Sequence, residues 1–266
     1  MKFAIFGNKH QTKKSRSIEQ LFAAMTAHGD TFAIDGPFYR FLCNEGIQVP
    51  EPQEIIEKNE FTADIAISFG GDGTLLRTAS RVGRSGIPVL GINAGRLGFL
   101  TATANENLND VFDKIHAGKF KVEELSLIEA VTNGTQLKSY PFALNEIAIM
   151  KHDSSSMITL KAVLNGNDTI TYQADGLIVA TPSGSTGYSL SVGGPIIAPS
   201  GSTGYSLSVG GPIITPDANV LALTPIASHS LNARPIVISD STVIEIKVNS
   251  RSRNFLIAID GRNESC

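Results

Sequence analysis

A glycine-rich loop that contains one carboxylate is the clearest candidate for chemistry in this sequence. The run Gly70-Gly71-Asp72-Gly73-Thr74 follows an apolar stretch at residues 64–69 and opens a helix-like pattern at residues 74–81. Glycines let the backbone approach a ligand closely, and the start of a helix favours negative charge. The loop therefore predicts a phosphate-binding turn between a strand and a helix.

The position of Asp72 inside such a turn needs an explanation, because a carboxylate repels phosphate. It can accept a proton from an attacking hydroxyl, or it can bind a Mg²⁺ ion that bridges to the phosphates. The simpler alternative is that Asp72 only caps the helix. A second small-residue loop begins at Asn93 and reads NAGRLG. It follows a strand-like stretch, where α/β sheets bind ligands, although an ordinary loop is an equal alternative.

Three further polar segments lie in the second half of the chain. Asn145 and Glu146 interrupt an apolar stretch at residues 142–150, so one of them faces the core or a cleft. A satisfied buried polar pair is the alternative. Asp175 precedes an apolar strand, and the hydroxyl-rich loop 181–188 follows that strand. The loop has donors and acceptors for a sugar or a base, although polar linkers look similar.

The elements that must position these residues change character along the chain. Strand-like and helix-like stretches alternate over the first hundred residues, which predicts a Rossmann-like, doubly wound parallel α/β domain at residues 1–103. Three prolines favour loop with fragments over residues 32–53. A helix over 106–117 is followed mainly by strands, and Asn165-Gly166 has the signature of a type I′ hairpin. Residues 104–266 are therefore expected to form a mostly antiparallel β-sandwich domain.

Composition limits the classes of function. The 266 residues carry a net charge of −3, which argues against a nucleic-acid-binding protein. No apolar run is long enough to cross a membrane, and the two cysteines show no framework of pairs. We expect no membrane or nucleic-acid partner, and a cytoplasmic location. No histidine has a partner at metal-ligand spacing, and neither an HExxH nor a CxxC motif occurs, so no protein zinc site is expected.

An exact repeat stands out beside these patterns. Residues 182–197 read PSGSTGYSLSVGGPII, and residues 199–214 repeat them without change at an offset of 17. Solenoid repeats drift in sequence and recur at least three times. The repeat is therefore interpreted as a recent tandem duplication or a sequence-assembly error.

Taken together, the motifs resemble the NAD kinase family. GGDGT alone is shared with lipid kinases of the diacylglycerol and sphingosine type, but the ordered set favours the NAD branch. The matching segments are GGDGTLLR (70–77), NAGRLGFL (93–100), LNE (144–146), ADGLIVATPSGSTGY (174–188) and LTPIASHSLNARP (223–235).

The resemblance implies transfer of the ATP γ-phosphoryl group to the 2′-hydroxyl of the adenosine ribose of NAD, with Mg²⁺, to give NADP. It implies that Asp72 is the general base and that neighbouring subunits of a homodimer or homotetramer help to complete the site. The remaining substrate-binding residues implied are Gly71, Gly73 and Arg77 for phosphates, Asn93 in the second loop, Asn145 and Glu146 for NAD, Asp175 beside a ribose, and Ser183, Thr186, Gly187, Tyr188 and Ser191 for adenine and ribose.

The sequence departs from the family pattern in three places. The family has one TPSGST loop and this chain has two; we favour the first copy, with residues 203–208 as the alternative set. The usual C-terminal segment that returns to the first domain is expected to be lacking. Leu125-Ser126 occupies a place where relatives often carry arginine. Two other functions stay open: a lipid kinase that shares GGDGT, and an NAD-binding protein with impaired catalysis.

Overall fold

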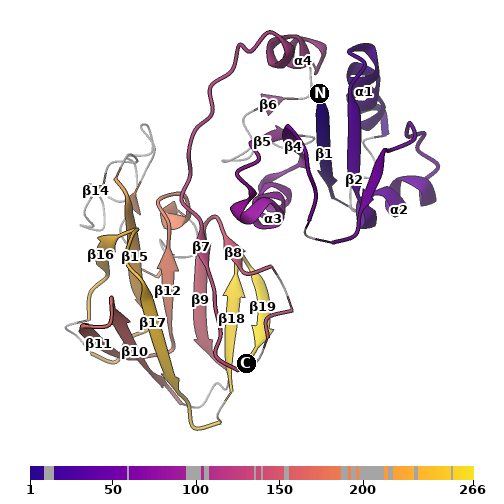
Figure 1. Cartoon of the computed structure of the whole chain (residues 1–266). Coiled ribbons are helices and arrows are strands. Elements are labelled where there is room, and N and C mark those ends of the chain that lie inside the picture. The colour runs from indigo at the N-terminus through magenta and orange to yellow at the C-terminus, as the bar shows by residue number, and fades with distance from the viewer. Residues whose placement is uncertain are drawn as a thin grey trace. The chain divides into compact units, whose positions relative to one another are not determined.

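The chain divides into two compact units, Met1–Glu124 and Leu125–Cys266, each with its own core (Figure 1). Unit 1 is mixed α/β and unit 2 is built of strands. The computed structural model describes residues 1–8, 15–58, 60–93, 103–104, 108–134, 136–138, 140–152, 156–186, 191–192, 196–197, 213–214, 218–230, 233–252 and 254–266.

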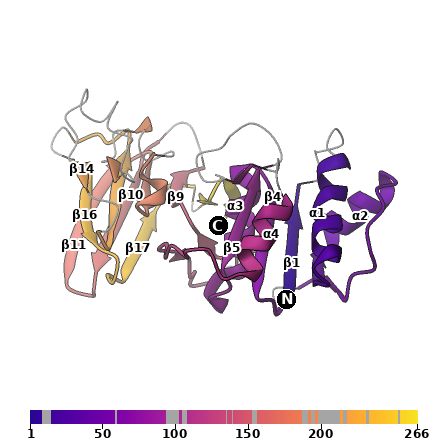
Figure 2. The ribbon, with the colours of Figure 1, turned by 90° about the horizontal axis from the view of Figure 1, so that it is seen from above.

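Unit 1 is a doubly wound sheet of six parallel strands in the order β3-β2-β1-β4-β5-β6, as the sequence predicted. The order reverses at β1, which places the start of the chain at the centre of the sheet. Helices flank the strands in Figures 1 and 2. The elements are β1 (Lys2–Gly7), α1 (Ser15–Ala27), β2 (Thr31–Asp35), α2 (Gly36–Asn44), β3 (Glu54–Ile56), β4 (Ile65–Gly70), α3 (Asp72–Val82), the short 3₁₀ turn η2 (Gly83–Ser85), β5 (Val89–Asn93), β6 (Thr103–Ala104) and α4 (Leu108–His116).

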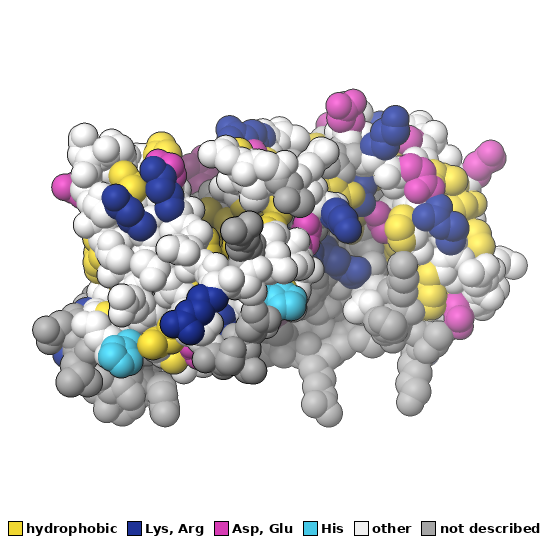
Figure 3. All heavy atoms as spheres, turned by 90° about the horizontal axis from the view of Figure 1, so that it is seen from below, with side chains coloured by type: hydrophobic (Ala, Val, Ile, Leu, Met, Phe, Trp, Pro, Cys, Tyr) yellow, Lys and Arg dark blue, Asp and Glu magenta, His cyan; other side chains and the backbone are white. Residues whose placement is uncertain are grey.

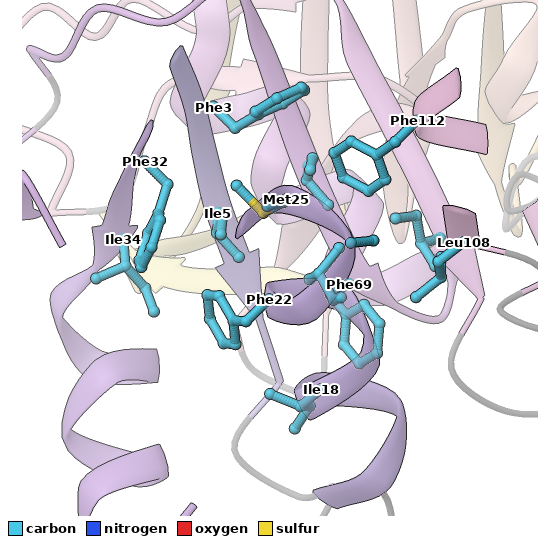
Figure 4. Packing of buried hydrophobic residues seen from close by; sticks show 14 of the residues in the cluster. Phe3, Ile5, Ile18, Phe22, Met25, Phe32, Ile34, Phe69, Leu108 and Phe112 are labelled. Atoms are coloured by element: carbon cyan, nitrogen blue, oxygen red, sulfur yellow. The ribbon is translucent and has the colours of Figure 1, made fainter. Parts of the chain in front are cut away.

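Both faces of this sheet are buried, because successive side chains of a strand point to opposite faces. Phe3 and Ile5 of β1 join one apolar cluster, whereas Ala4 and Phe6 join another. The first cluster is the larger and includes side chains of α1, α2 and α4, and Figure 4 shows its central members. The second includes Val82 of α3. The sheet thus holds its central strands rigidly between two layers.

Helix α4 packs on unit 1, although the sequence analysis placed residues 104–266 in the second domain. The fully buried ring of Phe112 meets Phe3 edge to face, with ring centroids 5.3 Å apart. Nε2 of His28, which follows α1, donates a 2.9 Å hydrogen bond to the Asp113 carboxylate of α4. The boundary between the compact units therefore falls at 124/125, after the helix rather than before it.

The expectation of a loop over residues 32–53 is wrong, because most of β2 and all of α2 lie within this range. Pro37 stands in the first turn of α2, where the missing N–H costs no hydrogen bond. The Asp35 side chain accepts from Phe38 N at 3.3 Å and caps the helix. Phe38 then fills the space beside Gly7, where an added Cβ would lie 2.2 Å from the ring.

Unit 2 is the predicted β-sandwich. One antiparallel sheet has the order β16-β15-β12-β9-β18-β19 and the other has the order β11-β10-β17, with apolar side chains of both in one core. The elements are β7 (Ile128–Glu129), β8 (Phe142–Ala143), β9 (Glu146–Lys151), β10 (Ile158–Leu164), β11 (Asp168–Ala174), β12 (Gly176–Ala180), the 3₁₀ turn η4 (Ser183–Thr186), β13 (Ile196–Ile197), β14 (Ile213–Ile214), β15 (Val220–Ile226), β16 (Ile236–Ser239), β17 (Ile244–Asn249), β18 (Phe255–Ile259) and β19 (Arg262–Ser265).

One hairpin turn of unit 2 was predicted from the sequence and another was not. Asn165 and Gly166 have φ of 49° and 76°, which confirms the hairpin between β10 and β11. Asp260 and Gly261, with φ of 46° and 75°, form a second hairpin that leads into the unexpected strand β19. The strand expected over residues 142–150 is interrupted at Leu144 and Asn145.

Surface charge is mixed on the face shown in Figure 3, where basic and acidic side chains are interspersed. Among the helices that the structure describes, none is long and apolar enough to span a bilayer.

Candidate functional site

The carboxylate loop lies where β4 ends and α3 begins. Gly71 occupies the N-cap position with φ −97° and ψ −172°, and it has no side chain that could cap the helix. Asp72 is therefore the first residue of α3 and not its N-cap. A carboxylate in the first turn is stabilised by the helix dipole. This arrangement keeps a negative side chain at the carboxyl edge of the sheet.

The two glycines beside Asp72 are not required by internal packing. A Cβ added at Gly71 or Gly73 would meet no atom within 4 Å among the residues that the structure describes. Gly7 is the opposite case, since the ring of Phe38 occupies the place that a Cβ of Gly7 would take. The absence of side chains at 71 and 73 thus leaves the backbone of the loop open to close approach by another molecule.

Three neighbouring strands end at this loop. Gly70 of β4 pairs in register with Asn93 of β5, which is 4% exposed. On the other side of β4, Arg77 of α3 reaches β1: its Nη2 donates to Gly7 O at 3.4 Å. Asp72, Arg77 and Asn93 are therefore gathered at the carboxyl ends of β1, β4 and β5, beside the reversal of strand order where such sheets bind ligands.

Two buried hydroxyl groups that the sequence analysis did not select belong to residues close to Asp72 along the chain. Ser68 Oγ of β4 and Thr74 Oγ1 of α3 have no hydrogen-bond partner among the residues that the structure describes. Thr74 belongs to the GGDGT run, but nothing in the sequence distinguished its hydroxyl from that of a buried structural threonine.

In unit 2, Asn145 and Glu146 carry unpaired polar atoms. Asn145 Oδ1 and Glu146 Oε2 are both buried without a partner in the described part of the chain, so the alternative of a satisfied polar pair is wrong. Burial, and secondly the charge of Asp260, raises the pKa of Glu146 to about 7. Unpaired buried acceptors are costly unless a ligand supplies donors.

Asp260 is the residue of this region that the sequence analysis missed. Its carboxylate accepts three consecutive backbone N–H groups, those of Leu144 at 2.8 Å, Asn145 at 2.9 Å and Glu146 at 3.0 Å. Burial raises the pKa of Asp260, and these hydrogen bonds oppose the rise. The Asp-Gly pair after an apolar strand was a hairpin signal, but it did not indicate these distant partners.

The hydroxyl-rich loop approaches Asn145 from the other side. Thr181 N donates to Asn145 O at 2.9 Å, and Ser183 begins the turn η4 that contains Thr186. The side chain of Thr186, and the expected site residues Gly187 and Tyr188, lie outside the described residues. Ser191 is described and exposed. The alternative set, residues 203–208, also lies outside the described part of the chain.

Asp175 is not gathered with Asn145 and Glu146. Strands β9 and β12 are antiparallel, with Ala180 opposite Glu146 and Gly176 opposite Met150. Asp175 therefore lies at the other end of this strand pair, about 13 Å or more from Glu146 along the strands. Its carboxylate forms an ion pair of 2.7 Å with Lys151.

Comparisons with known proteins place the chain in a family. A model of the ATP-NAD kinase N-terminal domain matches residues 8–120, and a model of the ATP-NAD kinase C-terminal domain matches residues 144–200 and 196–265. An NAD kinase of Bacteroides fragilis is 47% identical over 266 residues, which are 100% of this chain and 86% of that protein. An NAD kinase of Porphyromonas gingivalis is 42% identical over 264 residues, 99% of this chain and 85% of that protein.

Solved structures have the same fold. A yeast NADH kinase complexed with NADH aligns with a TM-score of 0.74 and 20% identity, covering 99% of this chain and 76% of that one. An NAD kinase from Archaeoglobus fulgidus in complex with ATP aligns with a TM-score of 0.66 and 24% identity, covering 100% of this chain and 86% of that one. Because the family models match most of the chain and the two relatives match at least 99% of it, the chain belongs to the ATP-NAD kinase family.

Proposed function

We propose that this chain is an NAD kinase, which transfers the γ-phosphoryl group of ATP to the 2′-hydroxyl of the adenosine ribose of NAD and so forms NADP. The observation that carries the proposal is the 47% identity to an NAD kinase along the whole chain. The two open glycines around Asp72 and the unpaired acceptors at Asn145 and Glu146 support it independently.

Asp72 serves as the general base in this proposal. A carboxylate at the carboxyl edge of a parallel sheet is fixed by the strand before it and the helix after it. It accepts the proton of the ribose hydroxyl as the oxygen attacks phosphorus, and the adenosine diphosphate leaves. The amides of the loop and Arg77 bind phosphate oxygens, because Gly71 and Gly73 leave room for close approach.

Mg²⁺ is proposed to arrive bound to ATP. Among the described residues, no group of three histidine, cysteine or carboxylate side chains could hold a metal ion. This fits Mg²⁺, which is commonly held by one or two carboxylates together with substrate phosphates and water. When bound, the ion neutralises phosphate charge.

Asn145 and Glu146 bind the dinucleotide. Asn145 Oδ1 is an acceptor, and Glu146 Oε2 accepts when its carboxyl group is ionised, so both atoms suit the hydroxyl and amine donors of a nucleoside. Ser183, Thr186, Gly187, Tyr188 and Ser191 are proposed to contact adenine and ribose, and Asn93 is proposed to line the phosphate side.

Asp175 is proposed to act in the site of a second copy of the chain. It lies at the far end of the β9–β12 pair from Asn145 and Glu146, yet the family pattern places it beside a ribose. A homodimer or homotetramer would reconcile this position with the role implied by the family pattern, since one subunit then supplies Asp175 to its neighbour. A cytoplasmic location is proposed as well, and Cys43 and Cys266 are both free thiols.

The decisive experiment offers the purified chain two phosphoryl acceptors side by side. With γ-labelled ATP and Mg²⁺, label is expected on NAD as NADP and none on diacylglycerol vesicles. Label on the lipid instead of NAD would favour the lipid-kinase alternative. Binding of NAD by calorimetry without any NADP over hours would favour the impaired protein, and either result would overturn the proposal.

A further inference from the structure

Asp260 binds the backbone of Leu144, Asn145 and Glu146 from one side. The Asp260 carboxylate accepts all three N–H groups at 2.8–3.0 Å, and Asp260 N donates to Glu146 O at 3.0 Å. Four polar groups of the interrupted strand are thus satisfied by one residue of the β18–β19 turn. Hydrogen bonds to a carboxylate are stronger than those to neutral acceptors.

Thr181 satisfies the remaining two carbonyls from the other side. Its hydroxyl lies 2.5 Å from Leu144 O and 3.2 Å from Asn145 O, and its N–H donates to Asn145 O at 2.9 Å. The hydroxyl oxygen also accepts Gly184 N at 3.1 Å. Thr181 is completely buried, so water cannot replace these bonds. The backbone of all three residues is fixed, while the side-chain acceptors of Asn145 and Glu146 are left for a ligand.

This arrangement distinguishes the two identical copies of the repeat. Thr181 precedes the first copy, but at the offset of 17 residues the second copy is preceded by Ala198, which has no hydroxyl. Within the first copy, an added Cβ at Gly184 would lie 2.0 Å from Asn145 O. The segment 144–146 therefore requires a hydroxyl followed three residues later by a glycine. The second copy offers only the glycine, Gly201.

We propose that Asp260 and Thr181 are positioning residues that hold Asn145 and Glu146 in their binding geometry, and that the Thr181 hydroxyl commits the first copy of the repeat to the site. The second copy is then dispensable for the site. The proposal rests on the proposed function where NADP formation is measured, but its structural part is measurable without activity.

Gly184→Ala and Gly201→Ala form a matched pair, because both glycines stand in the same PSGST sequence. Gly184→Ala is expected to raise the KM for NAD about tenfold or more, since the methyl group must displace the Asn145 carbonyl. Gly201→Ala is expected to retain the parent KM and kcat. The reverse pattern, equal effects of both variants, or no effect of either would overturn the assignment of the first copy.

Amide hydrogen exchange tests the positioning role without reference to catalysis. Thr181→Val keeps the shape and removes the hydroxyl, and Asp260→Asn removes the charge; each is expected to speed exchange at residues 144–146 about tenfold or more. Thr181→Ser is expected to restore slow exchange, and Asp168→Asn on the exposed edge of β11 is the control. Unchanged exchange in Thr181→Val and Asp260→Asn would overturn the proposal, even if the chain proved inactive towards NAD.

Discussion

Glu146 and Asp260 are joined by two hydrogen bonds of 3.0 Å, one from Glu146 N to the Asp260 carboxylate and one from Asp260 N to Glu146 O. Both residues are partly buried. Burial and the neighbouring Asp260 raise the pKa of Glu146 to about 7. The free chain therefore takes up a proton near neutral pH that an exposed glutamate would not hold.

This shift gives the stability of unit 2 a defined pH dependence. The folded pKa of Glu146 exceeds the ordinary value of 4.5, so the folded state binds more protons between these values and stability falls as pH rises from 4.5 to 7. Allowing for partial exposure, Glu146→Gln should remove about 1–2 kcal/mol of that fall. Urea unfolding followed by circular dichroism at pH 5 and pH 8 measures it. The control is Glu129→Gln, at an exposed position of β7; identical pH profiles for the parent chain and Glu146→Gln would contradict the prediction.

Asp72→Asn tests the general base. Loss of proton acceptance should lower kcat about 10²- to 10⁴-fold, while the KM for NAD and the circular dichroism spectrum change little. Asp110→Asn is a matched control, because Asp110 also lies in the first turn of a helix, α4. It should lose a similar helix-dipole interaction without loss of turnover. If Asp72→Asn retained turnover within about twofold of the parent chain, the carboxylate would not be the base.

Mixing two inactive variants tests whether the site is shared. If Asp175 serves a neighbouring copy, Asp72→Asn and Asp175→Asn should each be inactive alone. Heterodimers of the two would contain one site with both carboxylates. After unfolding and refolding an equal mixture, about a quarter of the parent activity should return, because half of the dimers are mixed and each has one intact site. No recovery, with mixed dimers shown by mass spectrometry, would place both carboxylates in one chain.

His28 links α1 to α4, and its protonation makes the stability of unit 1 depend on pH. Its Nδ1 lies 2.9 Å from Ala24 O and its Nε2 2.9 Å from the Asp113 carboxylate, so a doubly protonated ring satisfies both acceptors. The Ala24 carbonyl, and then Asp113, raise the pKa of His28. The stabilisation is therefore complete below pH 6.5 and is lost as pH rises through the folded pKa.

The corresponding variant is His28→Gln. The difference in unfolding free energy between the parent chain and this variant should be larger at pH 5.5 than at pH 8.5. His229→Gln, at an exposed position of unit 2, is the control and should show no such trend. A larger difference in unfolding free energy at pH 8.5 than at pH 5.5 would contradict the prediction that protonated His28 stabilises unit 1.

Elements with one strong local pattern could be predicted from the sequence. Strand β12 has the expected limits, and the Asn165-Gly166 hairpin follows from the need for positive φ at two positions. Helix α2 was missed because Pro37 was interpreted as a breaker, whereas in the first turn it is compatible with a helix. The cap by Asp35 was the local signal that could have corrected this.

The candidate site could be predicted only in part from the sequence, because the residues that position its side chains are distant along the chain. Asp72, Asn93 and Glu146 could be selected from motifs, but the role of Asp260 depends on amides 114 to 116 residues away. The packing of Phe112 on Phe3 likewise depends on a contact between segments more than a hundred residues apart, so the unit boundary was not visible in local composition.

The unpaired oxygens of Asn145 and Glu146 impose a penalty on the empty protein, roughly 1–3 kcal/mol for each. A dinucleotide that donates to both would cancel that penalty and stabilise the folded chain by mass action. Resistance of the polypeptide to proteolysis would then rise with the concentration of the dinucleotide.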